Sequence, residues 1–204
     1  MDVLRLGLVP YKEAFEKQLL YLEKRIKGEI PDTLLLLEHP AVITLGRSGK
    51  RENILNSKKI EIIEVTRGGD VTCHFPGQIV GYPILDLSKR KKDIHKYLRD
   101  LEEVLLNFLA VYGLKGTRIE GKTGVFAGKD KIASIGVAAK QWVSYHGFAV
   151  NIKKDISVFA SVIPCGLAGV KATSLELLLN RPVAMEEAYE NVTREFKNIF
   201  NGKN

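Results

Sequence analysis

The segment Arg67-Gly-Gly-Asp-Val-Thr-Cys-His-Phe-Pro-Gly-Gln78 lies at the centre of a predicted β-sheet. Strand-like residues precede it at 60–65 and follow it at 79–85, and Val71 to His74 continues the sheet inside it. Paired glycines let backbone amides face a ligand with no side chain between, and such amides can bind a phosphate or a developing oxyanion. The segment is therefore expected either to line a substrate site or to be a tight crossing in which the glycine pair supplies unusual dihedrals.

The elements around this segment predict an α+β fold with a mixed sheet and flanking helices. Apolar residues recur at helical spacing in three segments, and a glycine follows each of the first two. Strands outnumber helices without alternating regularly with them, which disfavours a doubly wound parallel sheet. The runs on either side of His39-Pro40 suggest a hairpin-like pair. The predicted helices are 14–26, 93–112 and 185–200, and the further strands are 33–38, 41–45, 124–127, 131–137 and 147–152.

The composition is that of an ordinary soluble protein. Of the 204 residues, 45% are hydrophobic and 27% are charged, and we expect one domain spanning 1–204. No apolar stretch approaches the roughly 20 residues that a membrane helix requires, and the first residues lack the order of a signal peptide. We therefore expect a cytoplasmic protein that does not associate with membranes. A reducing compartment would keep both cysteines, Cys73 and Cys165, as thiols.

The chain is basic, with a formal net charge of +7 and a pI near 9.3. Its basic residues are spread among acidic ones, so we expect no nucleic-acid partner. The densest basic segment, Lys89 to Lys92, is interpreted as a solvated surface turn. The net charge can also attract an acidic protein partner.

Histidines offer candidates for a metal site, but their spacing does not support one. A set of Cys73, His74, His146 and Cys165 has suitable ligand atoms, yet C-x-x-C and H-x-x-x-H spacings are missing. Nucleotide-binding glycine motifs are missing as well. We expect neither a metal nor another cofactor, and we interpret His95 as a surface residue.

Lys131 and Cys165 form the candidate catalytic pair. A free thiol has a pKa of about 8.5, so it becomes a good nucleophile only where a nearby cation stabilises its thiolate. Cys165 stands between Pro164 and Gly166, a turn that gives the sulfur little steric cover. Lys131 can be the cation, and the pair suits attack on an ester or thioester. The alternatives are a surface lysine and an inert buried thiol.

A series of ordered motifs resembles one enzyme family, the octanoyltransferases of lipoate biosynthesis, also called lipoyl(octanoyl) transferases. The resemblance spans most of the chain. Its motifs are Leu37-Glu-His-Pro40, Thr44-Leu-Gly-Arg47, Arg67 to Gln78, Gly81-Tyr-Pro-Ile-Leu-Asp-Leu87, Lys131-Ile-Ala-Ser-Ile-Gly136, Trp142-Val-Ser-Tyr-His-Gly-Phe-Ala149 with Asn151, and Ile163-Pro-Cys-Gly166.

The resemblance implies a fold similar to that of lipoate and biotin protein ligases. It also implies octanoyl (or lipoyl) transfer from acyl carrier protein to a lysine of lipoyl domains, in 2-oxoacid dehydrogenases and the glycine cleavage H protein. By the same resemblance Cys165 carries the acyl group as a thioester, and Lys131 activates the reaction. The implied substrate-binding residues are Arg67, Gly68, Gly69, Asp70, Val71, Thr72, Cys73, His74, Ser134, Ile135, Gly136, Gly147, Phe148 and Ala149.

Two residues depart from the family pattern, and two other functions remain open. The family usually has Tyr or Phe at Cys73 and Gly at Phe75, and these changes can alter pocket shape or acyl-length preference without removing either proposed catalytic residue. One rival is an ATP-dependent lipoate or biotin ligase of the same fold class, which ATP consumption with free octanoate would reveal. The other is a basic binding module, which would bind an acidic carrier or nucleic acid without acyl transfer.

Overall fold

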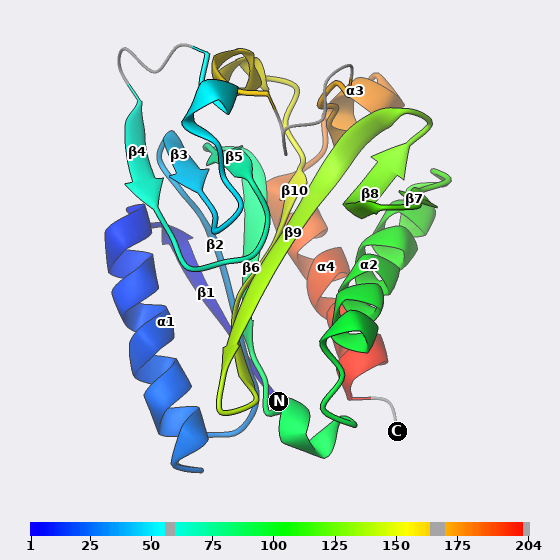
Figure 1. Cartoon of the computed structure of the whole chain (residues 1–204). Coiled ribbons are helices and arrows are strands. Elements are labelled where there is room, and N and C mark those ends of the chain that lie inside the picture. Colours follow the sequence, from blue (N-terminus) through cyan, green and yellow to red (C-terminus); the bar gives the residue numbers. More distant parts are fainter. Residues whose placement is uncertain (56–59, 164–169, 202–204) are drawn as a thin grey trace.

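The computed structural model describes residues 1–55, 60–163 and 170–201, and it contains two β-sheets and four α-helices in these ranges (Figure 1). The helices are α1 (Tyr11–Ile26), α2 (Ile94–Val111), α3 (Leu175–Leu179) and α4 (Met185–Phe200). The first strands are β1 (Asp2–Leu8), β2 (Thr33–Glu38), β3 (Val42–Leu45), β4 (Glu61–Glu64) and β5 (Val71–His74). The later strands are β6 (Gln78–Ile84), β7 (Thr117–Ile119), β8 (Lys122–Ala127), β9 (Asp130–Lys140) and β10 (Val143–Asn151).

The larger sheet has seven strands in the order β1-β2-β6-β10-β9-β8-β7. Only the pair β1 and β2 is parallel in this sheet, and the other neighbours are antiparallel. The smaller sheet has the order β4-β3-β5, with one parallel and one antiparallel pair. The α+β class with a mixed sheet and flanking helices is confirmed.

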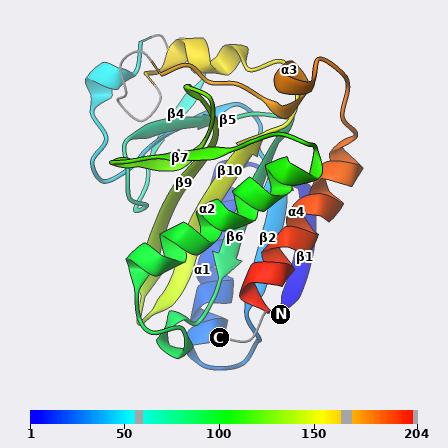
Figure 2. The same ribbon diagram turned by 90° about the vertical axis from the view of Figure 1, so that its right-hand side faces the viewer.

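Helices α2 and α4 cover one face of the large sheet and lie side by side (Figure 2). The apolar stripe predicted for α2 is buried: Leu101, Leu105 and Phe108 are fully inaccessible and pack in one cluster with Phe196 of α4 and Val150 of β10. Each such side chain contributes about 1.5–3 kcal/mol by leaving water. Asp93 caps α2, since its side chain accepts a hydrogen bond from the Lys96 amide. This face is the main core of the protein.

Helix α1 covers part of the opposite face of the large sheet. The small sheet lies next to α1 on this same side of the large sheet (Figure 1). Ala14 of α1 packs with Leu35, Leu37 and Val80 in a second, smaller cluster. The strands between α1 and the helices of the other face are apolar on both sides, which explains the unbroken run of leucines in β2. No helix in the described ranges combines the length and apolarity needed to cross a membrane.

The predicted hairpin of 33–38 and 41–45 is wrong. Strand β2 lies in the large sheet between β1 and β6, whereas β3 lies in the small sheet between β4 and β5. The connection passes between the sheets because His39 is buried there, where its ring nitrogens bond to the Val9 carbonyl and the Tyr82 hydroxyl. Both edges of β2 are already paired, so β3 has no place beside it.

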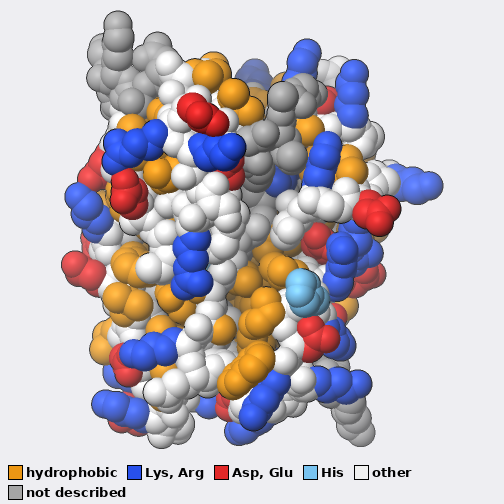
Figure 3. Space-filling view, viewed as in Figure 1, with side chains coloured by type: hydrophobic (Ala, Val, Ile, Leu, Met, Phe, Trp, Pro, Cys, Tyr) orange, Lys and Arg blue, Asp and Glu red, His pale blue; other side chains and the backbone are white. Residues whose placement is uncertain are grey.

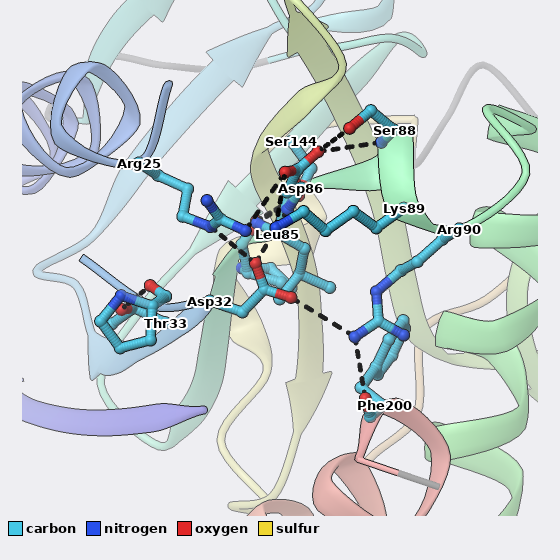
Figure 4. Close-up of polar contacts among 12 residues, drawn as sticks. Arg25, Asp32, Thr33, Leu85, Asp86, Ser88, Lys89, Arg90, Ser144 and Phe200 are labelled. Carbon is cyan, nitrogen blue, oxygen red and sulfur yellow. Dashed lines mark hydrogen bonds and ion pairs between the residues drawn. The ribbon is translucent and has the colours of Figure 1, made fainter. Parts of the chain in front are cut away.

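Polar contacts around Asp32 and Arg90 join segments that are distant in the chain (Figure 4). Asp32 accepts hydrogen bonds from Arg25 Nε (2.8 Å), the Asp86 amide (2.9 Å) and Arg90 (3.4 Å). Arg90 also donates to the Phe200 carbonyl (2.8 Å) and lies over the Phe200 ring. The contacts therefore link the ends of α1, β6 and α4 to the start of α2.

Candidate active site

A cavity of about 170 Å³ lies between the large sheet and the small sheet. It is similar in size to an engineered apolar cavity of roughly 150 Å³ that holds one benzene molecule. Its lining residues come from α1, β5, β6, β8, β9, β10 and the 67–70 loop. Segments far apart in the sequence thus form a pocket large enough for a short apolar chain.

Most of the predicted substrate-binding residues line this cavity. The ones that do are Arg67, Gly69, Asp70, Thr72, His74, Ser134, Ile135, Gly136, Gly147, Phe148 and Ala149, together with Lys131.

Three of the predicted residues, Gly68, Val71 and Cys73, do not line the cavity. Residues alternate between the two faces of β5, so that Thr72 and His74 face the cavity while Val71 and Cys73 face away. Val71 and Cys73 pack with Ile43 in a cluster on the far side. The departure from the family pattern at Cys73 therefore lies outside the cavity.

Lys131 is buried at the start of β9, with 4% of its surface exposed. Its ammonium nitrogen donates to the Thr123 carbonyl (2.9 Å) and lies 5.6 Å from the centre of the Phe126 ring. Gly124 makes room for this side chain: a Cβ there would come within 2.8 Å of Lys131 Cε and 2.5 Å of the Ala133 carbonyl. The φ of +121° at Gly124 also favours glycine. The local sequence of β8 thus sets the position of the lysine.

Cys165, the predicted nucleophile, lies outside the described residues. The residues that flank the gap on its far side are held against Lys131. The Lys131 amide donates to the Lys171 carbonyl (2.7 Å), and the Thr173 amide donates to the Lys131 carbonyl (2.9 Å). Before the gap, the Ile163 amide donates to the Asn53 carbonyl (2.8 Å).

A chain of buried amides connects the Thr173 backbone to His74. The Asn151 side chain donates to the Thr173 carbonyl (2.9 Å), and Gln78 donates to Asn151 (2.9 Å). His74 Nδ1 donates to Gln78 Oε1 (2.7 Å). Because buried polar groups are costly unless bonded, this network fixes the position of the segment next to Lys131 relative to β5, β6 and β10.

Glycines on adjacent strands form the floor of the cavity. Gly136 of β9 pairs with Gly147 of β10, and Gly81 of β6 pairs with Phe148, the residue that follows Gly147. A Cβ on Gly147 would lie 2.1 Å from the Gly81 carbonyl, and a Cβ on Gly136 would lie 2.9 Å from the Gly68 carbonyl. Only glycine permits such close approach, and it leaves the floor without side chains.

The buried Arg67 holds the 67–70 loop over this floor. Its guanidinium donates to the Thr44 carbonyl and hydroxyl (both 2.9 Å) and to the Gly68 carbonyl (3.0 Å). The Gly68 amide donates to the Val137 carbonyl (3.0 Å), so it is already used by the fold and is a poor candidate for binding an oxyanion. Arg67 therefore orders the roof of the cavity.

Aromatic residues and histidines close one end of the cavity. Tyr11, Tyr82 and His146 line it, and His39 lies behind them. His39 Nδ1 approaches the Val9 carbonyl (2.6 Å), which can only accept, so Nε2 accepts the proton of the Tyr82 hydroxyl (2.7 Å). The motifs predicted neither tyrosine as a site residue, although Tyr82 stands in the family-like segment Gly81 to Leu87.

His146 adopts a left-handed backbone conformation, with φ +57°, inside β10. The Gln18 side chain of α1 accepts from its amide (2.8 Å), and Thr66 contacts its Nε2 (3.0 Å). Non-glycine residues with positive φ are uncommon and need such support. The conformation turns the imidazole toward the cavity, a position that strand alternation alone does not predict. Exposed His95 lies on α2, as expected for a surface residue.

Burial keeps the three interior histidines neutral. It lowers the pKa of His39 to about 4 and, with help from the Arg67 charge, that of His146 to about 3. Burial and the neighbouring His39 hold the pKa of His74 well below the usual value. Burial also raises the pKa of Tyr11 to about 12, so this phenol is neutral as well.

We expect stability to fall steeply below pH 6.5. Each folded-state pKa lies below that of an unfolded histidine, so the unfolded chain binds protons first, and the stability present above pH 6.5 is lost as the pH falls toward 4. Each histidine should cost about 1.4 kcal/mol of unfolding free energy per pH unit. Urea unfolding at pH 7.5, 6.0 and 5.0 measures this slope. The His39→Gln substitution should reduce the slope of unfolding free energy against pH, and His95→Gln should not. An unfolding free energy that stays constant from pH 6.5 to 5 would contradict the lowered histidine pKa values.

Among the described residues, no group of three or more histidine, cysteine or acidic side chains is placed to hold a metal ion. The cavity instead joins a buried amine at Lys131, a glycine floor and a neutral aromatic end. This arrangement can hold an apolar chain beside a few polar groups that orient its reactive end.

Residues 10–197 match the family model of the lipoyl protein ligase A/B catalytic domain. The chain belongs to this family. An octanoyltransferase of Syntrophotalea carbinolica is 46% identical over 199 residues, which cover 98% of this chain and 94% of that protein. One of Caldicellulosiruptor saccharolyticus is 46% identical, with coverage of 100% and 90%. The chain is therefore an acyltransferase of this family, and the resemblance to octanoyltransferases is confirmed.

Solved structures of this family and of biotin protein ligases share the fold. A lipoate-protein ligase A bound with ATP has a TM-score of 0.74 and 18% identity, covering 98% of this chain and 85% of that one. The biotin protein ligase of Aquifex aeolicus has a TM-score of 0.56 and 9% identity, with coverage of 98% and 69%. At such identities the likeness establishes the fold, and it confirms the predicted similarity to ligase catalytic domains.

Proposed function

We propose that the protein transfers an octanoyl group from acyl carrier protein to a lysine of a lipoyl domain, through a thioester on Cys165. The observation that carries the proposal is the buried Lys131 amine at a cavity that is floored by glycine and also lined by Ile135, Phe148 and Ala149. Family membership and the octanoyltransferase relatives support the acyl group and the acceptor. The expected compartment is the cytoplasm, where carrier and acceptors would be present together.

In the first half-reaction the Cys165 thiolate attacks the carbonyl carbon of the carrier thioester. A bond forms from Cys165 sulfur to this carbon, the bond to the carrier sulfur breaks, and the carrier leaves as a thiol after taking up a proton from the Lys131 ammonium, which leaves that amine neutral. The Lys131 ammonium is the cation proposed to favour the thiolate. The acyl tail lies on the floor of Gly136 and Gly147, where each buried methylene gains about 0.8 kcal/mol.

In the second half-reaction the acceptor lysine attacks the Cys165 thioester. An amide bond forms, the bond from carbon to Cys165 sulfur breaks, and the proton of the attacking amine passes to Lys131 in its neutral form. The Cys165 thiolate is regenerated. No nucleotide takes part, because the thioester is already activated.

The turnover test uses purified octanoyl carrier protein and an apo lipoyl domain without ATP, and mass spectrometry detects the modified acceptor. We expect a gain of one octanoyl group on the acceptor. The rival is an ATP-dependent ligase, since a solved relative is bound with ATP. Transfer from free octanoate that requires ATP, with none from the carrier, would favour this rival and contradict the proposal.

The surface is consistent with a protein partner that makes limited charge contacts. On the face shown in Figure 3, Lys and Arg side chains are interspersed with Asp and Glu around a group of hydrophobic side chains in the lower centre, although the net charge is +7. Several charged side chains of the protein already pair with one another, such as Lys96 with Asp100. Exposed charges are screened by salt, so carrier binding should weaken as ionic strength rises.

A further inference from the structure

The aromatic end of the cavity suggests how the protein measures its acyl chain. We propose that Tyr82, held by His39 and flanked by Tyr11, closes the pocket and limits the accepted acyl chain to about eight carbons. This inference rests on the proposed function, because it assigns the acyl tail to the cavity. Nothing in the proposed chemistry itself requires the two tyrosines.

Strand register places Lys131 and Tyr82 at opposite ends of the cavity. Gly136 is five residues along β9 from Lys131 and pairs with Gly147, and Tyr82 follows Gly81 at this level of the sheet. Five residues of extended strand span roughly 17 Å. An acyl chain of eight carbons has seven carbon–carbon bonds, about as many bonds as two to three backbone residues, and so spans roughly 8 Å. The distance is therefore sufficient for the octanoyl chain together with the reacting groups and the tyrosine ring.

The closing residues are buried and fixed. Tyr11 and Tyr82 expose only 5% and 3% of their surfaces. The Tyr82 hydroxyl is bonded to His39, which is bonded in turn to the Val9 carbonyl. The Tyr11 ring lies against His39 and His74, with centroids 5.1 and 5.9 Å away. Moving Tyr82 aside for a longer chain would leave the buried His39 nitrogen without its donor, which is costly.

Burial of the acyl tail would end at this wall. Up to eight carbons, each added methylene should raise transfer roughly fourfold because it leaves water for the cavity. Beyond that length, a further methylene meets a ring that cannot move without breaking a buried hydrogen bond. The preference for eight carbons therefore has two sources. Hydrophobic burial disfavours shorter acyl chains, and steric contact with the Tyr82 ring excludes longer ones.

The test compares kcat/KM for octanoyl, decanoyl and dodecanoyl carrier proteins in Tyr82→Ala, Tyr11→Leu and the unmodified protein. Removing the Tyr82 ring leaves space for roughly four methylenes in a close-packed interior. We expect the ratio of decanoyl to octanoyl transfer to rise at least about tenfold in Tyr82→Ala. Tyr97→Ala is the matched control: Tyr97 is equally buried, at 3%, but lies on α2 across the sheet, so its loss should leave the ratio unchanged.

Three outcomes would overturn the inference. One is an unchanged ratio in Tyr82→Ala and Tyr11→Leu when circular dichroism shows both folded. Another is an equal rise in Tyr97→Ala. The third needs no variant: the unmodified protein would transfer dodecanoyl as well as octanoyl. Failure of the proposed function is distinguishable, because then no chain length would be transferred by the unmodified protein.

Discussion

Replacing Cys165 with alanine is expected to reduce acyl transfer by at least about 10³-fold, because the substitution removes the proposed nucleophile. Incubation of the unmodified protein with octanoyl carrier protein should add one octanoyl mass to the chain, and peptide mapping should place it on Cys165. The Cys165→Ala protein should acquire no such mass. The acceptor lysine then has no enzyme thioester to attack.

Cys73→Ala provides the matched control, since Cys73 is the chain's other thiol. It faces away from the cavity and packs with Ile43 and Val71, so alanine there should lower stability modestly and leave the adduct in place. An adduct that disappears in Cys73→Ala but persists in Cys165→Ala would contradict the proposed thioester. Transfer at full rate with no adduct in either protein would do the same.

Replacing Lys131 with methionine is expected to lower transfer by about 10²–10⁴-fold, the usual contribution of a positioned acid or base. Methionine keeps the apolar stem that packs beside Phe126 and Gly124, so the fold should be retained. The rate of acceptor modification is measured by mass spectrometry across pH 6–9. The rate should be low throughout this range in the variant, and circular dichroism should show that its fold is retained.

Two further variants test the assignment of Lys131. Lys131→Arg should be as inactive as the methionine variant, because a guanidinium stays protonated and cannot accept the proton. Lys129→Met should change transfer less than about twofold, because Lys129 is exposed two residues earlier. Activity retained in Lys131→Arg would show that a permanent positive charge suffices, and it would rule out the proton-accepting role.

The elements with strong periodicity could be predicted from the sequence. The apolar stripe of α2 predicted a helix, and the apolar or alternating runs of β6, β9 and β10 predicted strands. The predicted ends of these elements lie within a few residues of the observed ends. The parallel strand β1 was missed, because Gly7 interrupts a short edge strand whose register shifts between Arg5 and Leu8. The hairpin failed for a different reason: strand pairing depends on partners far away in the chain, and no local pattern at His39-Pro40 encodes them.

The site residues were predicted mainly from family motifs, and the errors in this prediction have a physical cause. A motif lists consecutive residues, whereas a strand turns alternate residues to opposite sides, so Val71 and Cys73 were assigned together with Thr72 and His74. Tyr11 was missed because α1 brings it to the cavity from the beginning of the chain. His146 faces the cavity because its backbone φ is positive, and the periodicity of the sequence does not reveal such a conformation.

The division of the strands between two sheets affects how far the sequences of proteins with this fold can diverge. The described strands of the small sheet form no ladder with the large one, so substitutions that shift β3, β4 or β5 can reshape the cavity without repacking the helices. The cavity can then change its shape while the helix-covered sheet persists. Such freedom is a physical reason why ligases with only 9–18% identity to this chain retain the same architecture.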